Sequence, residues 1–217
     1  MKVSLLDLGT KPYPEVWELQ KALVEARSRE EAPDSLILVE HEHVITLGRK
    51  TSPGNLKPQA VPVFQVERGG DATYHGPGQL VGYPIIKMEV PDVRAFVRAL
   101  EEVLILTSRA FSIDAGRRES HTGVWVGDRK LASIGVAVTN WVTYHGFALN
   151  VNTDMSFFQL IKPCGLEPET MTSMEMLTGR RLEMEAVKRE VVRSFSSVFE
   201  VDVAKWVIPL PNTLAQL

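Results

Sequence analysis

The sequence predicts an α/β (α+β) domain in which helices flank a mixed sheet. One reason is that strand-like runs follow one another directly, as SLILVE at 35–40 and VITLG at 44–48 do, which a strictly alternating parallel fold does not allow. A second reason is that the stretches 92–111 and 183–200 carry apolar residues at helical spacing. A boundary near residue 180 is conceivable but no linker marks it, so we expect a single domain over residues 1–217.

The expected elements follow from local patterns, and no internal repeat interrupts them. A proline near the start of 14–31 favours a helix there, and Gly127-Asp128 inside a β-rich stretch predicts a hairpin turn. In order, we expect a strand at 3–8, a helix at 14–31, strands at 35–40 and 44–48, a loop at 52–58, glycine-interrupted strands at 61–88, a helix at 92–111, strands at 123–151 and a helix at 183–200.

The composition predicts a cytoplasmic protein whose partners are neither nucleic acids nor membranes. With 24 basic and 27 acidic residues the net charge is −3, so the chain lacks the overall positive charge of a nucleic-acid-binding protein. No apolar run approaches the roughly 18–20 residues that a membrane span needs, and the apolar patch near the N-terminus is broken by Asp7 and too short for a signal peptide. The single cysteine excludes an internal disulfide and fits a reducing compartment.

The segment RGGDATYHGPGQLVGYP at 68–84 carries the densest chemical signal. Its five glycines and two prolines are unfavourable in a plain strand. Glycine serves where the backbone takes a positive φ or approaches a ligand closely, which we expect at Gly70 and Gly76. The segment is neither a phosphate-binding Walker loop nor a dinucleotide fingerprint, because the required Gly-Lys-Ser/Thr and helix-opening glycines are missing. A ligand-free hairpin remains an alternative, but Arg68 and His75 favour a loop that lines a substrate site.

The only cysteine, Cys164, lies in IKPCGLEP between Pro163 and Gly165, which favours a loop or turn. A lone cysteine is most often a small buried apolar residue. To act as a nucleophile it needs a histidine, a cation or a helix N-terminus that favours the thiolate. Lys130, in RKLASIGVAV, is a candidate cation, although most lysines are simply exposed to solvent. The residues alone leave this pairing open.

The five histidines offer other chemistry. His41 and His43 are two residues apart, so a strand would place both on one face, as a metal site sometimes requires. No further cysteine is present to help, and nothing constrains a third ligand from His75, His121 or His145, so we expect no metal site. A cysteine–histidine pair with His75 or His145 as the base, as in cysteine proteases, is the stronger alternative.

A set of motifs decides between these possibilities. RGGDATYHGPGQLVGYPI, RKLASIGVAV, HGFALNV and IKPCGL occur in the order and approximate spacing typical of the octanoyltransferases of lipoate biosynthesis. The preceding stretch HEHVITLGRKTSPGNL resembles the corresponding stretch of that family. The motifs run from about His41 to Leu166, over half of the chain. Departures at Lys162, Asn140 and Trp141 put none of the catalytic positions in doubt.

This resemblance implies a fold, two catalytic residues, a set of substrate-lining residues and two kinds of partner. The fold is an α/β domain related to the biotin and lipoate protein ligases. Cys164 matches the cysteine that carries an acyl thioester, and Lys130 matches the lysine that tunes it. The acyl donor is octanoyl-acyl carrier protein, and the acceptors are the lipoyl domains of 2-oxoacid dehydrogenases and the glycine cleavage H protein. The resemblance implies neither a cofactor nor a metal. The implied substrate-lining residues are Arg68, Gly69, Gly70, Asp71, Ala72, Thr73, Tyr74, His75, Ser133, Ile134, Gly135, Gly146, Phe147 and Ala148.

The chemistry of the residues agrees with these roles. A thiol with a pKa of about 8.5 is only a few per cent thiolate at pH 7, and a neighbouring ammonium at Lys130 would raise that fraction. After Cys164 is acylated, Lys130 loses its counter-ion and can act as the general base for the acceptor amine. Thioester exchange followed by amide formation needs no ATP. The small residues at 132–137 and 146–148 can open an apolar slot for the acyl chain.

Three rival functions remain. An ATP-dependent lipoate or biotin protein ligase would have a related fold but would form an acyl-adenylate and would not need Cys164. A cysteine thioester hydrolase would use the same thiol with water as the acceptor. A module that only binds the carrier protein would keep its function after Cys164 is alkylated.

Overall fold

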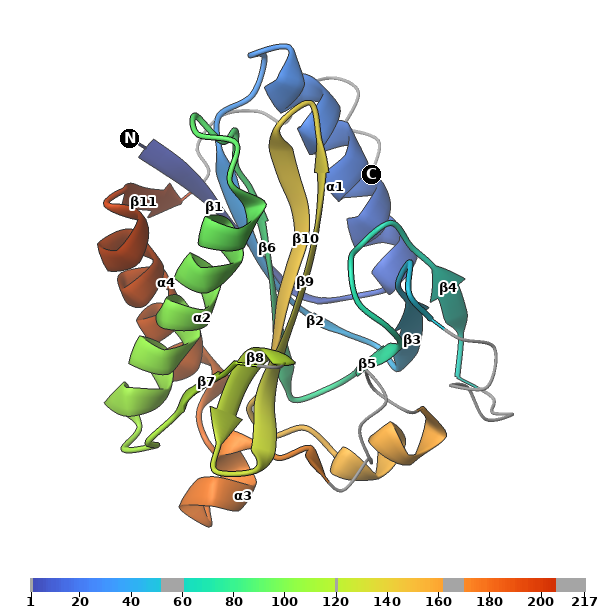
Figure 1. The fold of residues 1–217 in the computed structure, drawn as a ribbon, viewed down its shortest axis with the longest axis vertical. Coiled ribbons are helices and arrows are strands. Elements are labelled where there is room, and N and C mark those ends of the chain that lie inside the picture. The colour runs from blue at the N-terminus through green and yellow to red at the C-terminus, as the bar shows by residue number, and fades with distance from the viewer. Residues whose placement is uncertain (1, 52–60, 120, 162–169, 206–217) are drawn as a thin grey trace.

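A computed structural model describes residues 2–51, 61–119, 121–161 and 170–205 of the chain. Within these ranges the strands form a large mixed sheet and a small one (Figure 1). The large sheet has the order β11 (Asp202–Lys205), β1 (Lys2–Lys11), β2 (Ser35–His41), β6 (Gln79–Ile85), β10 (Val142–Asn150), β9 (Arg129–Thr139), β8 (His121–Val126) and β7 (Gly116–Arg118). The small sheet has the order β4 (Val63–Gln65), β3 (Val44–Leu47) and β5 (Thr73–His75).

The large sheet is mixed because its two halves pair differently. β1 lies parallel to both β11 and β2, whereas each pair from β2 through β6, β10, β9 and β8 to β7 is antiparallel. At the centre, Ala148 of β10 is opposite Val81 of β6 on one side and Ser133 of β9 on the other. This central register fixes which side chains of β6, β10 and β9 share a face: Ala148 shares one with Val81 and Ser133, and Phe147 shares the other with Ile134.

Helices cover both faces of the large sheet (Figure 1). α1 (Tyr13–Ser28) packs on the face that carries Ile37, Val39 and Val81, and α2 (Val93–Ala110) and α4 (Met184–Phe199) pack on the opposite face. Asp92 caps α2 by accepting a hydrogen bond from the Ala95 amide at 2.9 Å. Each fully buried Leu, Ile or Phe side chain in these layers contributes about 1.5–3 kcal/mol. No helix in the described ranges is long and apolar enough to cross a membrane.

The small sheet lies beside strands β9 and β10, together with residues 66–72 of the chain that connect β4 to β5. The amide of Gly69 donates to the carbonyl of Val136 in β9 at 3.0 Å, which anchors the glycine-rich segment to the large sheet. Behind the segment, a separate apolar cluster joins β3 and β5 to the 3-10 helix η2 (Met155–Leu160). Helix α3 (Met174–Thr178) then leads the chain towards α4.

The observed fold confirms the predicted class and most of its elements. The three predicted helices appear as α1, α2 and α4, and the β-rich stretches resolve into β4 to β6 and β8 to β10. The turn between β8 and β9 contains Gly127 at a φ of 56°, as the hairpin prediction required. The sequence did not predict β7, β11, η2 or α3, since each is short and β7 and β11 (GRR and DVAK) lack an alternating apolar pattern. The loop predicted at 52–58 lies outside the described residues.

Candidate active site

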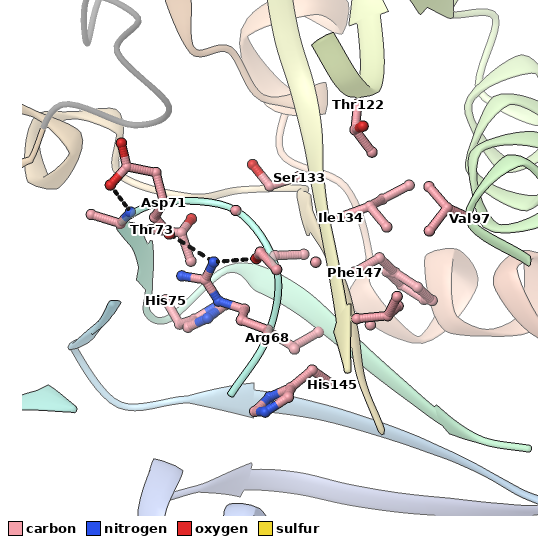
Figure 2. A pocket seen from close by; sticks show the side chains of 18 of the residues that line it. Arg68, Asp71, Thr73, His75, Val97, Thr122, Ser133, Ile134, His145 and Phe147 are labelled. Atoms are coloured by element: carbon pink, nitrogen blue, oxygen red, sulfur yellow. Dashed lines mark hydrogen bonds between the residues drawn. The ribbon is translucent and has the colours of Figure 1, made fainter. Parts of the chain in front are cut away.

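A cavity of about 560 Å³ lies between the glycine-rich segment and strands β9 and β10 (Figure 2). This volume is in the range of sites for small organic ligands. Figure 2 shows Val97, Ile134 and Phe147 together on the side of the cavity nearest α2. Arg68 and His75 lie on the opposite side of β9. The cavity therefore suits a ligand that has an apolar part and a polar part.

Nearly all of the residues expected to line a substrate site do line this cavity. Tyr74 is the exception among them. Strand alternation explains it, because Thr73 and His75 point to one face of β5 and Tyr74 between them points to the other. Lys130, the expected cation, also lines the cavity. The expected residues that do so are Arg68, Gly69, Gly70, Asp71, Ala72, Thr73, His75, Lys130, Ser133, Ile134, Gly135, Gly146, Phe147 and Ala148.

Arg68 organises the glycine-rich segment from within. Its side chain is buried, and its guanidinium donates to the carbonyls of Thr46 and Asp71, each at 2.7 Å, and to that of Gly69 at 3.2 Å. Such charge-assisted bonds are stronger than bonds between neutral groups. A side chain at Gly135 would approach the Gly69 carbonyl to 2.9 Å, so glycine in β9 lets the segment lie close to the sheet. These contacts give Arg68 a structural role at the cavity wall.

The two glycines expected to have special backbone roles differ. Gly70 has a φ of 84°, which confirms the expectation of a positive φ, and it lines the cavity. Gly76 has no positive φ and does not line the cavity. A Cβ at Gly76 would instead overlap the hydroxyl of Tyr74. Gly76 is therefore needed as glycine to make room for Tyr74.

Lys130 extends into the cavity from the start of β9. Its side chain is only 4% exposed, and its Nζ lies 5.5 Å from the centre of the Trp125 ring. Gly123 makes room for it, since a Cβ there would lie 2.7 Å from Lys130 Cε. The backbone of Lys130 pairs with Met171, and its carbonyl accepts from the Thr172 amide at 3.0 Å. Cys164 itself lies outside the described residues, so its pairing with Lys130 stays a prediction.

His75 belongs to a buried polar network. Its Nδ1 lies 2.8 Å from Gln79 Oε1, and Gln79 Nε2 donates to Asn150 Oδ1 at 2.9 Å and to the Tyr74 carbonyl at 3.1 Å. Because the Gln79 amide nitrogen is used as a donor, its oxygen is the acceptor, which assigns the proton of His75 to Nδ1. Burial, together with the charges of His41 and Arg68, holds the pKa of His75 well below its usual range. His75 is therefore neutral at physiological pH.

His145 lies at the other end of the cavity from Lys130. It is opposite Val136 in the β9 register, six residues along the strand from Lys130, which corresponds to roughly 20 Å. Its Nε2 lies 3.2 Å from Glu67 Oε2. Burial nevertheless lowers the pKa of His145 to about 4, although the Glu67 carboxylate opposes this shift. His145 is thus a neutral group whose ring nitrogen is held by a carboxylate.

His41 and His43 do not share a strand face in the way that a metal site on β2 would require. His41 ends β2 and is bonded through Nδ1 to the Lys11 carbonyl at 2.9 Å and through Nε2 to the Tyr83 hydroxyl at 2.8 Å. His43 lies in the bend that follows and contacts Tyr74 instead. Across the described ranges, no three His, Cys, Asp or Glu side chains are grouped as ligands for a metal ion.

The sequence did not identify the residues that other elements contribute to the cavity. Tyr13 comes from α1, Tyr83 from β6, Val97 from α2 and Thr122 from β8. Helical spacing did place Val97 on the apolar face of its helix, but no local signal directed it to a ligand site. These contributions depend on the tertiary packing of four separate elements.

Comparison with known proteins adds an independent finding. Residues 12–196 match the family model described as the lipoyl protein ligase A/B catalytic domain. A relative in Pyrobaculum calidifontis, named "Probable octanoyltransferase", is 48% identical over 97% of this chain and 90% of its own length. A relative in Rubrobacter xylanophilus, named "Octanoyltransferase", is 45% identical over 88% of this chain and 90% of its own.

A solved structure confirms the fold class. The structure of a putative lipoate protein ligase from T. acidophilum with bound lipoic acid superposes with a TM-score of 0.81, covering 100% of this chain and 93% of that one. The two sequences are only 17% identical, so this likeness concerns the fold.

Proposed function

This chain belongs to the lipoyl protein ligase A/B catalytic domain family and is an acyltransferase, and on that premise we propose that it moves an octanoyl group from acyl carrier protein to a lysine of a lipoyl domain. The acyl group is carried in between as a thioester on Cys164. The observation that carries this proposal is the cavity, which is lined by an apolar side and by the buried Lys130, whose backbone pairs with Met171 on the later flank of residues 162–169.

The surroundings of Lys130 support a pairing with Cys164. Residues 162–169 are bracketed by Ile161 and Met171, both buried in one apolar cluster with Ala72, which lines the cavity. Met171 also pairs with Lys130 through the backbone. The chain on both sides of residues 162–169 therefore packs in one cluster with Ala72 of the cavity wall, and on the later side it pairs with Lys130.

In the first half-reaction the Cys164 thiolate attacks the carbonyl carbon of the donor thioester. A new carbon–sulfur bond forms on Cys164, the bond to the carrier thiol breaks, and the carrier leaves as a thiol after taking up one proton. Lys130 as an ammonium would favour the thiolate, with each unit of pKa depression contributing about 1.4 kcal/mol. A buried ammonium acts more strongly than an exposed one, because less water screens its charge.

In the second half-reaction the acceptor amine attacks the acyl-Cys164 carbonyl. The carbon–nitrogen bond forms, the bond to Cys164 breaks and the thiolate is restored. The amine must lose protons on the way, and its usual pKa is about 10.4. Once the thiolate charge is gone, Lys130 loses its stabilising partner, so its pKa falls and it can accept one of these protons.

The apolar side of the cavity is the proposed place of the acyl chain. Val97 of α2 lies there with Ile134 and Phe147 of the sheet. Seven buried carbons at about 0.8 kcal/mol each would provide roughly 5–6 kcal/mol before ordering costs. Octanoyl and lipoyl groups both fit this chemistry, and we propose both as transferable groups.

A histidine base is the main mechanistic alternative, and the geometry argues against one of its two forms. His145 lies at the far end of the cavity from Lys130 and its Nε2 is engaged by Glu67. His75 is closer to the segment in question, since Gln79 and Asn150 connect it to the Thr172 carbonyl. His75→Gln, compared with Lys130→Met in the transfer assay, therefore tests the other form.

The test is transfer from octanoyl-acyl carrier protein to a lipoyl domain in the absence of ATP. We expect the parent protein to octanoylate the lysine and Cys164→Ala to lose transfer. Transfer that requires ATP, together with ATP–pyrophosphate exchange, would indicate an adenylating ligase instead. Release of free octanoate without modification of the acceptor would indicate a thioester hydrolase. Near-parental transfer by Cys164→Ala would refute the covalent mechanism.

A further inference from the structure

Tyr74 is the residue of the RGGDATYH run whose side chain turns away from the cavity, and it enters an aromatic stack. The Tyr74 and Phe157 rings lie 5.0 Å apart at an interplanar angle of 6°, and the His43 and Phe157 rings lie 4.3 Å apart. Phe158 meets Tyr74 edge-on at 5.5 Å. The stack thus joins the bend after β2, the strand β5 and the helix η2, which are far apart in the sequence.

The hydroxyl of Tyr74 also has a defined hydrogen-bond partner. It lies 2.8 Å from His43 Nδ1, and the absence of a side chain at Gly76 leaves room for it. Burial raises the pKa of Tyr74 well above its usual range, so the hydroxyl keeps its proton at any physiological pH. A directional bond between two ring systems fixes their orientation, whereas apolar contact alone permits sliding.

The stack continues through packed side chains to Met171, whose backbone pairs with that of Lys130. Phe158, Ile161 and Met171 belong to the same apolar cluster as Tyr74. Ile161 and Met171 are the buried residues on either side of residues 162–169. Met171 pairs with Lys130, and the next amide donates to the Lys130 carbonyl at 3.0 Å. One cluster therefore contacts both flanks of the segment that carries Cys164 and is bonded directly to the strand that carries Lys130.

From this arrangement we infer that Tyr74 and His43 are positioning residues, which fix the flanks of the Cys164 segment relative to Lys130 through Phe157 and the cluster behind it. The inference rests on the proposed function, since it assumes that Cys164 is the nucleophile. It explains why a tyrosine stands in a run whose other members line the cavity. It also explains the need for glycine at position 76.

The test uses Tyr74→Phe, which keeps the stacked ring and removes only the hydroxyl. The rate of Cys164 alkylation by iodoacetamide is followed across pH, and kcat and KM for octanoyl-acyl carrier protein are measured on the same samples. We expect the midpoint of the alkylation profile to rise by about one pH unit, equivalent to about tenfold less thiolate at neutral pH. We expect kcat to fall by about tenfold with KM for the donor nearly unchanged.

Three further variants separate positioning from packing. Tyr144→Phe removes a hydroxyl from another buried tyrosine, which does not line the cavity, and should leave profile and kcat at parental values. Both His43 variants lose the ring that stacks on Phe157, but His43→Gln keeps an acceptor for the Tyr74 hydroxyl and should stay closer to parental values than His43→Leu, which loses the ring and the bond. Because both single variants remove the same hydrogen bond, the double variant Tyr74→Phe/His43→Leu should be no worse than His43→Leu alone.

The outcomes distinguish this inference from the proposed function. If Cys164→Ala abolishes transfer but Tyr74→Phe changes only the melting temperature, Tyr74 is merely structural and the inference fails alone. A rise in KM without a change in kcat or in the alkylation profile would make Tyr74 a substrate contact, which also overturns it. If Cys164→Ala retains transfer, the proposed function and the inference fail together.

Discussion

The large sheet and the glycine-rich segment beside it are held together by different forces. β2, β6 and β10 are buried almost throughout, and helices cover both of their faces. Residues 68–76, the part of the segment before β6, contribute Ala72 and Tyr74 to a small apolar cluster, and this part is also kept in place by the buried Arg68, by the bond from the Gly69 amide to the Val136 carbonyl and by the His75 network. Apolar burial provides stability without direction, whereas hydrogen bonds provide direction with a small net stability. The cavity forms where the two kinds of construction meet.

Replacing Lys130 should have the largest effect of the changes considered, and it should lower activity without lowering stability. Lys130 lies on the large sheet, and methionine fills a similar volume without the charge. We expect Lys130→Met to lower transfer by about 10²–10⁴-fold, the usual contribution of an acid–base group, with little loss of melting temperature. Steady-state transfer and thermal melting on the same preparation check this.

A matched control is Lys188→Met. Lys188 is also buried, but it bonds to Asp7 at 2.9 Å and to Glu185 at 2.8 Å, away from the cavity. This variant should lower the melting temperature and leave turnover per folded molecule unchanged. Equal loss of turnover in the two lysine variants would contradict a chemical role for Lys130.

Among the variants considered, replacing Gly146 inside the large sheet should lower the free energy of unfolding strongly. A Cβ at Gly146 would overlap the backbone carbonyl of Gly82 in the neighbouring strand, and backbone cannot yield as a side chain can. We expect Gly146→Ala to lower the free energy of unfolding by about 3 kcal/mol, measured by urea denaturation. Gly116→Ala, with nothing within 4 Å of the added atom, should change it little. Similar losses of unfolding free energy in the two variants would show that the close approach of β10 to β6 does not require glycine at position 146.

The buried histidines should make the folded state sensitive to acid. Burial lowers the pKa of His41 to about 4 from the ordinary 6.5. The unfolded chain therefore binds more protons between these values, and the free energy of unfolding falls as pH drops from about 6.5 to about 4. His41 alone should account for up to roughly 3 kcal/mol. Urea denaturation across this pH window should show a shallower slope for His41→Gln, and an unchanged slope would contradict the assignment.

Glycine in the segment should matter less for stability and more for activity. Gly70 has a φ of 84°, and no atom lies closer than 3.6 Å to an added Cβ. Gly70→Ala should therefore cost only about 1 kcal/mol of backbone strain, while transfer falls by more than the loss of folded protein explains. Gly127→Ala carries similar strain at a φ of 56° in an open turn. It should cost the same stability and leave transfer unchanged. If Gly127→Ala loses as much transfer as Gly70→Ala, the loss in Gly70→Ala is due to stability and not to the cavity.

The sequence could predict the elements whose pattern is local. The apolar spacing of α2 and α4 and the glycine turn between β8 and β9 were sufficient for this. The short strands β7 and β11 were not predictable, because they form only against neighbouring strands. Cavity residues within contiguous motifs could be named in advance, since a family resemblance marked them. Tyr13 and Val97 could not, because packing between separate elements brings them to the cavity.

Tyr74 illustrates the limit most clearly. Its position inside a motif predicted a substrate contact, whereas strand alternation turns its side chain to the opposite side from its two neighbours. Alternation was available from the sequence, but which face of β5 meets the cavity was not. Its partner His43 lies 31 residues away, in a stretch that the family resemblance covered, but the sequence indicated no role for its side chain except as a possible metal ligand.

The most direct test of the account is the intact mass of the protein after it is mixed with octanoyl-acyl carrier protein without an acceptor. We expect a gain of one octanoyl group, located on Cys164 by peptide mapping and removed by hydroxylamine. Lys130→Met should gain the group slowly at neutral pH and faster as the pH is raised, because the thiolate then forms without help. No gain by the parent protein, or the same gain by Cys164→Ala, would contradict the central claim that the cavity serves a covalent acyl transfer through Cys164.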